Sequence, residues 1–244
     1  MDLGLDGWRV LVTGATNGIG AAIAATLVEE GAVVAGCGRT PGGAFPEGVH
    51  TSIYEDLVDP EAPARVIEAA VAGLGGLDAV VSCAGRGITG TVESSDEELW
   101  EEGLSLNLLS VARLARLSLP HLRERQGRFL VVTALSGSEP QADHAVSNVG
   151  KAGAANLAKS LSREVAAEGI LVNALAPGRV LGGQMRKRFP TEEQRREFAA
   201  PRIPVGRFGD PGEVAPFAAL LVSPRNTYVT GQELTIDGGM SQSF

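Results

Sequence analysis

Cysteine is scarce in this 244-residue sequence, and the scarcity excludes two classes of site. Cys37 and Cys83 are too few for a disulfide framework, so we expect a reducing, cytoplasmic environment. Neither cysteine stands at a CxxC or Cys/His spacing that would hold zinc. We therefore expect no metal site.

Basic charge and long apolar runs are also lacking. Lys and Arg number 21 against 29 Asp and Glu, a formal net charge of −8, which excludes a basic nucleic-acid-binding arm. No apolar run approaches the ~18 residues of a membrane span, and no basic residue before Arg9 marks a secretory signal. We expect a protein that binds neither nucleic acid nor membrane.

The composition that is present, 44% hydrophobic and 20% charged residues, predicts one globular domain over residues 1–244. Short β-branched runs alternate with helical stretches, which is typical of βαβ units. The predicted strands are 8–13, 33–37, 50–54, 79–82, 128–133, 170–173 and 233–236. We predict an α/β fold of Rossmann type: a doubly wound, mostly parallel seven-stranded sheet with helices on both faces.

One connection is unusually long. Residues 179–206 lie between the sixth strand and the last helix, and within them Thr191 and Gln194 form a predicted capping box. Long connections are often functional, so this segment is either a substrate lid or a surface helix that only covers the sheet.

Glycine marks the first turn. Gly14, Gly18 and Gly20 follow the first strand and open the helix predicted over 18–30. Glycine lets the backbone turn tightly and approach a pyrophosphate closely, and the start of a helix offers free N–H groups with a positive dipole end. Strand, turn and helix together predict a dinucleotide site.

At this turn the sequence resembles the short-chain dehydrogenase/reductase family, whose motif TGxxxGxG is read here from Thr13 to Gly20. The resemblance covers essentially the whole chain and is strongest to 3-oxoacyl-carrier-protein reductase-like members. Its further matches are Asp56-Leu57, Ser82-Cys83-Ala84-Gly85, Asn107, Lys151, Asn173, Pro177-Gly178, Thr230-Gly231-Gln232 and Asp237-Gly238-Gly239.

The resemblance implies where a nucleotide cofactor is held. The implied contacts are Gly14, Asn17, Gly18, Ile19, Gly20, Asp56, Leu57, Ser82, Ala84, Gly85, Lys151, Pro177, Gly178 and Val180. Asp56 and Leu57 would flank the adenine, and Ala84 and Gly85 would line the nucleotide with backbone atoms.

The second strand ends without the carboxylate that would accept hydrogen bonds from the adenosine ribose and favour NAD. A 2′-phosphate needs a cation instead, and Arg39 offers a planar donor fork, with Asn17 and Thr40 adding neutral hydrogen bonds. NADP (as NADPH) is the predicted cofactor, ahead of NAD. The alternative is that Arg39 is a solvated surface residue, since no second basic residue supports it.

The family's catalytic hydroxyls are both missing. Its tyrosine lies four residues before the lysine, where this chain has Ser147 before Lys151, and its serine lies thirteen residues earlier, where this chain has Ala134. Tyr54 and Tyr228 are the only tyrosines, and neither can occupy the vacant position. Asn107 and Lys151 are retained. Serine is a far weaker acid than tyrosine, so Ser147 is a poor proton donor near neutral pH.

Three other groups are candidates for that role. His144 lies seven residues before Lys151, two helical turns if the helix has already begun, and histidine titrates near neutrality; it can equally be a surface or capping residue. Ser136 enters the site if the strand end bulges, and is otherwise a loop residue. Lys151 itself can act directly or through water.

The resemblance also implies a homodimer or homotetramer, with its seam on the helices predicted over 96–122 and 146–168. Ser95 and Glu98 form a predicted capping box at the start of the first, which we expect to be interrupted near Pro120.

These observations favour an NADP(H)-dependent oxidoreductase that reduces a carbonyl or conjugated enone of a small molecule with a non-standard proton donor. Loss of a general acid costs ~10²–10⁴-fold in rate, which an activated substrate tolerates. Two alternatives stay open. One is a non-redox lyase, dehydratase or isomerase on the same scaffold, and the other is a non-catalytic nucleotide-binding subunit.

Overall fold

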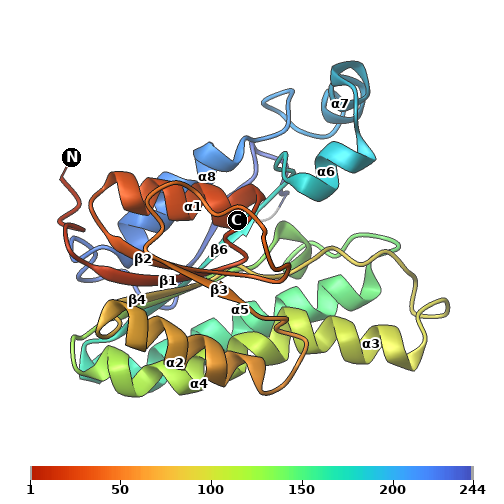
Figure 1. Ribbon diagram of the computed structural model, residues 1–244. Helices are drawn as coiled ribbons and strands as arrows, with labels where there is room; N and C mark the ends of the chain where they lie inside the picture. Colours follow the sequence, from red (N-terminus) through yellow and green to blue (C-terminus); the bar gives the residue numbers. More distant parts are fainter. Residues whose placement is uncertain (1, 243–244) are drawn as a thin grey trace.

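The computed structural model describes residues 2–242, which form the predicted α/β fold around one seven-stranded sheet (Figure 1). The strands are β1 (Arg9–Thr13), β2 (Val33–Gly38), β3 (Thr51–Tyr54), β4 (Ala79–Ser82), β5 (Arg128–Val132), β6 (Leu171–Pro177) and β7 (Glu233–Ile236). Their order is β3-β2-β1-β4-β5-β6-β7, and every neighbouring pair is parallel. The strand order changes direction between β1 and β4, where open α/β sheets bind ligands.

Helices cover both faces of the sheet. They are α1 (Gly18–Glu29), α2 (Ala62–Leu74), α3 (Glu97–Leu104), α4 (Ser110–Arg123), α5 (Ala145–Val165), α6 (Gly183–Arg188), α7 (Glu192–Ala199) and α8 (Pro211–Val222). Helices α1 and α8 pack together on one face, and α2, α4 and α5 lie on the other (Figure 1). Within residues 2–242, no helix combines the length and apolar character needed to cross a bilayer.

Strand β1 shows how the sequence divides the core. Val10 and Val12 are buried in the cluster beneath α1 and α8, whereas Leu11 between them is buried in the cluster beneath α2, α4 and α5. Successive side chains of a strand point to opposite faces, so a continuous apolar run is needed when helices cover both.

Two predictions for the helix over 96–122 are wrong. Its N-cap is Asp96, whose carboxylate accepts the N–H of Leu99 at 2.9 Å, while the Ser95 hydroxyl donates to the Thr91 carbonyl at 2.7 Å. Pro120 does not interrupt the helix: it lies in the last turn of α4, which continues to Arg123. The irregularity comes earlier, as a π-helical segment over Ser105–Leu109 that joins α3 to α4.

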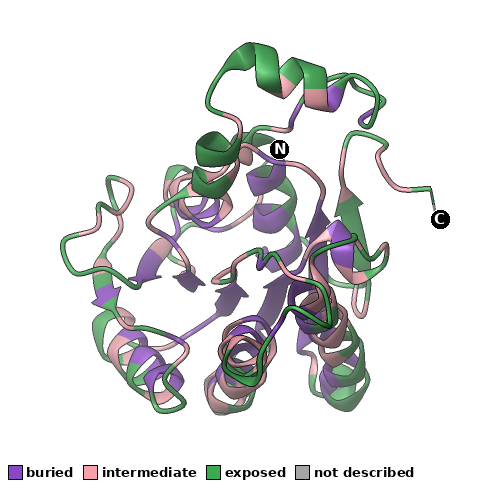
Figure 2. Ribbon diagram, turned by 90° about the vertical axis from the view of Figure 1, so that its right-hand side faces the viewer, coloured by how far each residue is buried: buried purple, intermediate pink, exposed green. Residues whose placement is uncertain are grey.

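Residues 179–206 carry α6 and α7, and the predicted capping box of Thr191 and Gln194 is confirmed. The rings of Phe189, Phe198 and Phe208 lie 4.8 to 5.5 Å apart and form a small core separate from that of the sheet. Figure 2 shows the two helices projecting from the body of the protein, with mostly exposed surface.

Asp78 ties the beginnings of β1 and β4 together. Its carboxylate accepts the backbone N–H of Arg9 at 3.0 Å, the Arg9 guanidinium at 2.8 and 3.1 Å, and Arg125 Nε at 3.1 Å. Burial raises the pKa of Asp78, but the hydrogen bonds from the two arginines outweigh it and leave the pKa below its usual range.

We expect Asp78→Asn to lower the free energy of unfolding by about 3 kcal/mol at neutral pH, because the mostly buried Arg9 guanidinium loses its counterion and the exposed Arg125 loses a partner. A carboxyl whose pKa is depressed by folding stabilises the protein above its unfolded pKa of about 3.9 and ceases to do so as the pH falls through the folded pKa. Urea unfolding of both proteins should therefore show the difference shrinking below about pH 4. The control Asp59→Asn removes an exposed pairing with Arg65 and should change stability far less; equal losses would contradict the assignment.

Candidate active site and cofactor cleft

Glycine shapes the turn after β1 at positions where a side chain does not fit. Gly14 and Gly18 have φ angles of +70° and +57°, in the left-handed region. A Cβ on Gly14 would lie 3.0 Å from Ala84 Cα in the loop after β4, and a Cβ on Gly20 would overlap the Gly14 carbonyl oxygen. The turn is therefore bare backbone, as a pyrophosphate cradle requires.

The start of α1 is left uncapped. Asn17 occupies the N-cap position with extended backbone, its exposed side chain makes no capping hydrogen bond, and the first turn holds no acidic residue. Ile19, half-buried, is the second residue of the helix. The N–H groups of this turn thus have no side-chain acceptor among the described residues, and they suit an anion.

The end of β4 adds a second unsatisfied group. Thr13 Oγ1 accepts the N–H groups of Cys83 and Ala84 at 3.1 Å each, which holds the ends of β1 and β4 side by side. The buried Ser82 hydroxyl has no hydrogen-bond partner within residues 2–242. Burial raises the pKa of the Cys83 thiol to about 11, so this cysteine is neutral and a poor nucleophile.

Strand β2 ends at Gly38, where a Cβ would overlap the Thr16 side chain and thus close the approach to the glycine turn. Arg39 and Thr40 follow it and are exposed, as is Asn17 across the turn. Arg39 has no ion-pair partner in the part of the chain that the structure describes. Its guanidinium is thus available to an external anion.

Asp56 and Leu57 follow β3 at the same edge of the sheet. The Asp56 side chain is exposed and accepts the N–H of Val58 at 3.1 Å, whereas Leu57 is buried in the core. Only backbone atoms of Leu57 and one carboxylate are therefore presented to solvent here.

Asn107 and Lys151 meet at Gly85. Asn107, buried on the π-helical segment, accepts the N–H of Arg86 and donates to its carbonyl, at 3.1 Å each. Lys151 Nζ donates to the Val132 carbonyl at 3.0 Å. A Cβ on Gly85 would lie 2.8 Å from Lys151 Nζ and 2.9 Å from Asn107 Oδ1, so both groups reach one point of the loop after β4. Burial lowers the pKa of Lys151.

A cavity of about 120 Å³ opens at the ends of β5 and β6. Ala134, Ser136, His144 and Ser147 all line it, so the structure brings together both altered catalytic positions and two of the three candidate proton donors. Asn107 and Lys151 do not line it.

Ser147 is committed to a structural role. Its hydroxyl accepts the N–H of Ile88 at 2.5 Å and donates to the carbonyl of the same residue at 3.3 Å. The hydroxyl thus uses both its donor and its acceptor capacity to hold the loop after β4 against α5. A hydrogen bond from Ser147 to a substrate carbonyl would have to compete with these bonds.

His144 stands at the N-cap position, and α5 begins at Ala145, so the premise that the helix has already begun at His144 is wrong. His144 Nδ1 donates to the Ala142 carbonyl at 2.9 Å, and because a carbonyl oxygen only accepts, the proton is on Nδ1. Gly90 fixes the backbone on either side, donating to the Asp143 carbonyl at 2.7 Å and accepting from Ala145 at 3.0 Å. Nε2 is left as the nitrogen that exchanges a proton.

Ser136 reaches the cavity by a route that the sequence analysis did not foresee. The end of β5 does not bulge; instead Leu135–Gly137 form a turn of 3₁₀ helix. Ser136 as a residue is largely buried, and its hydroxyl makes no hydrogen bond within residues 2–242.

Strand β6 extends four residues beyond the predicted 170–173 and delivers Pro177 and Gly178 to the wall of the cavity. Val180 is buried and pairs with Gly209. The sequence analysis missed Gly182, whose Cα lies 3.4 Å from where a Gly18 Cβ would be. The paired glycines at 182–183 were the available signal for this close approach.

Two further polar groups were missed. Gln141 and Arg179 line the cavity beside His144, and an Arg179 side-chain N–H donates to Gln141 Oε1. Arg179 follows the Pro177-Gly178 pair directly, and that position was the only sequence signal for it. Met185, from α6, closes the same wall.

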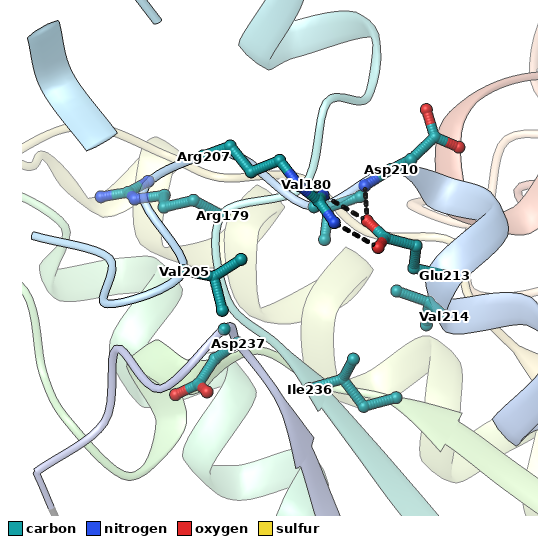
Figure 3. Close-up of a pocket in the computed structure, with 11 residues that line it drawn as sticks. Arg179, Val180, Val205, Arg207, Asp210, Glu213, Val214, Ile236 and Asp237 are labelled. Atoms are coloured by element: carbon teal, nitrogen blue, oxygen red, sulfur yellow. Dashed lines mark hydrogen bonds and ion pairs between the residues drawn. The ribbon is translucent and has the colours of Figure 1, made fainter. Parts of the chain in front are cut away.

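A larger cavity, of about 180 Å³, lies between β6, β7 and the start of α8 (Figure 3). Arg207 and Glu213 make two hydrogen bonds of 2.7 Å across it, and Asp210 caps α8. None of the predicted catalytic residues lines it. Among the described residues, no cluster of three or more His, Cys, Asp or Glu side chains is placed to hold a metal ion.

Comparison with known proteins gives concordant matches. The family model described as enoyl-(acyl carrier protein) reductase matches residues 14–241. The 3-oxoacyl-[acyl-carrier-protein] reductase FabG of Vibrio cholerae is 35% identical, over 98% of this chain and 99% of its own.

Two solved structures add to this. An NADPH-bound short chain oxidoreductase from Pseudomonas aeruginosa PAO1, described as containing an atypical catalytic center, is 32% identical with a TM-score of 0.90, covering 97% of this chain and 98% of that one. L-sorbose reductase from Gluconobacter frateurii, complexed with NADPH and L-sorbose, is 29% identical with a TM-score of 0.93 and full coverage of both chains.

The matches extend over nearly the whole chain, and the solved structures share its fold. The chain belongs to the short-chain dehydrogenase/reductase family of oxidoreductases.

Proposed function

We propose that the protein is an NADP(H)-dependent reductase of a carbonyl or conjugated enone in a small molecule, with a proton donor other than tyrosine. The observation that carries the proposal is the cavity that gathers His144 and Ser136 around Ala134, next to the Pro177-Gly178 turn. The NADPH-bound relatives support the cofactor, and the relative with an atypical catalytic center supports a departure from the family's usual acid.

The cofactor cleft fits a dinucleotide phosphate. The uncapped start of α1 and the bare turn at Gly14 and Gly18 would hold the pyrophosphate. The Ser82 hydroxyl and the Lys151 ammonium would hold polar atoms toward the nicotinamide end, and Arg39 would face the 2′-phosphate.

The chain's own residues supply the proton. When bound, NADPH supplies a hydride to the substrate carbon. In this step the imidazolium form of His144 gives its Nε2 proton to the substrate oxygen and becomes the neutral ring, which keeps the Nδ1 proton on the Ala142 carbonyl. Ser136 donates a hydrogen bond to the same oxygen. Lys151, half-buried and donating from Nζ to the Val132 carbonyl, assists by stabilising the developing alkoxide directly or through water.

Residues 179–206 act as a lid in this proposal. Gln184 Oε1 accepts the N–H of Gly87 at 3.3 Å, Gly182 approaches the glycine turn, and Met185 lines the cavity. Three separate contacts thus join this segment to the glycine turn, to the loop after β4 and to the cavity beside His144.

We also propose a dimer or tetramer built on α4 and α5. Leu109, before α4, is 41% exposed, and Val149, on α5, is 49% exposed, which leaves apolar surface for a second copy of the chain.

The cofactor choice predicts that Arg39→Met weakens NADPH binding about 10- to 100-fold, because a charge-assisted contact to the 2′-phosphate is lost. NADH lacks this phosphate, so its affinity should not change. Titration of nucleotide fluorescence measures both constants, with Arg196→Met, which removes an exposed arginine of α7, as the control. An equal loss for NADPH and NADH would show that Arg39 does not read the phosphate.

The proton-donor assignment is tested by NADPH oxidation, followed by absorbance, with ketones, quinones and enones. We expect turnover with NADPH, and a fall in kcat of about 100-fold or more for His144→Gln with little change in KM.

Ser147→Ala is the matched comparison. It leaves the buried N–H of Ile88 unpaired, so we expect a loss of stability of about 1–3 kcal/mol and nearly normal turnover by the folded protein. Loss of turnover in Ser147→Ala with retention in His144→Gln would reverse the two roles. NADPH binding without any turnover would instead favour the non-redox enzyme or the nucleotide-binding subunit.

A further inference from the structure

Arg179 is a cation whose surroundings do not neutralise it. It follows β6, is half-buried, and lines both the cavity beside His144 and the larger one next to it. One guanidinium N–H donates to the neutral amide oxygen of Gln141, the Phe198 ring centroid lies 5.6 Å from its central carbon, and its buried Nε has no partner within residues 2–242.

The nearest charges have the same sign. Burial lowers the pKa of Arg179, and Arg188 and Arg202 lower it further. Among the residues that the structure describes, no carboxylate pairs with it. Asp237 lines the larger cavity too, but its oxygens accept the N–H groups of Gly239 and Ser241 at 2.8 and 2.6 Å.

Two other arginines show how this protein normally satisfies a guanidinium. Arg207 makes a two-bond pair with Glu213, and Figure 3 shows Arg179 directed away from that pair. Arg128, which is buried, donates from its two terminal nitrogens to the backbone carbonyls of Gln126, Gly127 and Asn226, although its Nε, like that of Arg179, has no partner within residues 2–242. Arg179 has neither arrangement, although an unpaired buried charge is costly.

An anion bound in the cavity would supply the counter-charge and the hydrogen-bond acceptor that Arg179 lacks. The planar guanidinium fork presents two parallel N–H groups to a carboxylate, and here Nε is one N–H without a competitor. The cavity, at about 120 Å³, is far smaller than the ~300–1,000 Å³ of sites for larger ligands, which favours a short molecule.

We propose that Arg179 is the residue that selects the substrate, and that it binds the carboxylate of a short oxo acid whose carbonyl lies toward His144. The choice of an oxo compound rests on the proposed reductase function, whereas the carboxylate recognition rests on Arg179 alone.

The test measures binding without turnover. Isothermal titration calorimetry with NADP⁺-saturated protein, and again without nucleotide, compares pyruvate, 2-oxobutanoate and laevulinate with their methyl esters. We expect at least one acid to bind at least tenfold more tightly than its ester. NADP⁺ carries no hydride to transfer, so this measurement reports acid binding whether or not the protein is a reductase. Acid binding without any NADPH oxidation would contradict only the reductase proposal.

Three variants locate the effect. Arg179→Met keeps an apolar stem against Phe198 and should weaken the acid about 10- to 100-fold while leaving the ester unchanged. Gln141→Glu keeps Arg179 but gives it an internal counterion, and it should also weaken the acid at least tenfold. Arg196→Met, on the exposed face of α7, removes the same charge and should change neither.

Thermal unfolding verifies that each variant is folded. If Arg179→Met does not fold, Gln141→Glu still tests the proposal. Equal affinities of acids and esters for the parent protein would overturn the proposal. So would an acid preference that persists in both site variants.

Discussion

The change in strand order between β1 and β4 is the constraint on which the rest of this structure depends. Because β2 and β4 lie on opposite sides of β1, the connections that leave β1 and β4 cross opposite faces of the sheet, and ligands of open α/β sheets bind in the crevice at such a point. The Thr13 hydroxyl then joins the two ends through the N–H groups of Cys83 and Ala84, and Gly14 lies against Ala84 at a distance that excludes a side chain. One residue change there would move the start of α1 and the loop that carries Gly85, so the two halves of the site are set by a single junction.

The two halves of the proposed site, the cofactor cleft and the cavity beside His144, are built from different parts of the polypeptide, and that difference decides how freely the residues of each can change. The cofactor half consists of backbone N–H groups, bare turns and a helix end, which depend on chain path and small residues. The reaction half consists of side chains on the ends of β5, β6 and the start of α5, and any of these can change without moving the backbone. Ser147 illustrates the outcome, since its hydroxyl now secures Ile88 and the loop around it. In the proposed reductase the proton then comes from groups on neighbouring turns, and His144 and Ser136 line the cavity from two of them.

Features of this structure that depend on residues close together in the sequence could be predicted, and those that depend on residues far apart could not. The seven strands, their parallel order and the glycine turn depend on local patterns, and they were predictable. The N-cap at Asp96 was not, because Ser95 and Asp96 are both good caps and only the chain's approach from Thr91 separates them. Asn107 was predicted to lie in a helix, but its π-helical setting and its two hydrogen bonds with Arg86 across the site were not. Arg179 and Gln141 stand 38 residues apart, and Gln184 and Gly87 stand 97 apart, so no pattern along the chain connects either pair.

The cavity holds a positive charge, that of Arg179, in a protein whose net charge is negative. This contrast bears on how the site would select an anion. With a net charge of −8, the surface does not draw anions from a distance, and at physiological ionic strength such fields fade within ~8 Å. Arg179 acts at contact range and in a partly buried setting, where screening by salt is weak. Discrimination at such a site comes from the charge of the acceptor, because a carboxylate pairs with the guanidinium fork and neutralises it, whereas a neutral analogue offers a weaker acceptor and no counter-charge. A cavity of this kind therefore rejects neutral molecules by failing to stabilise them, with no need for a steric barrier.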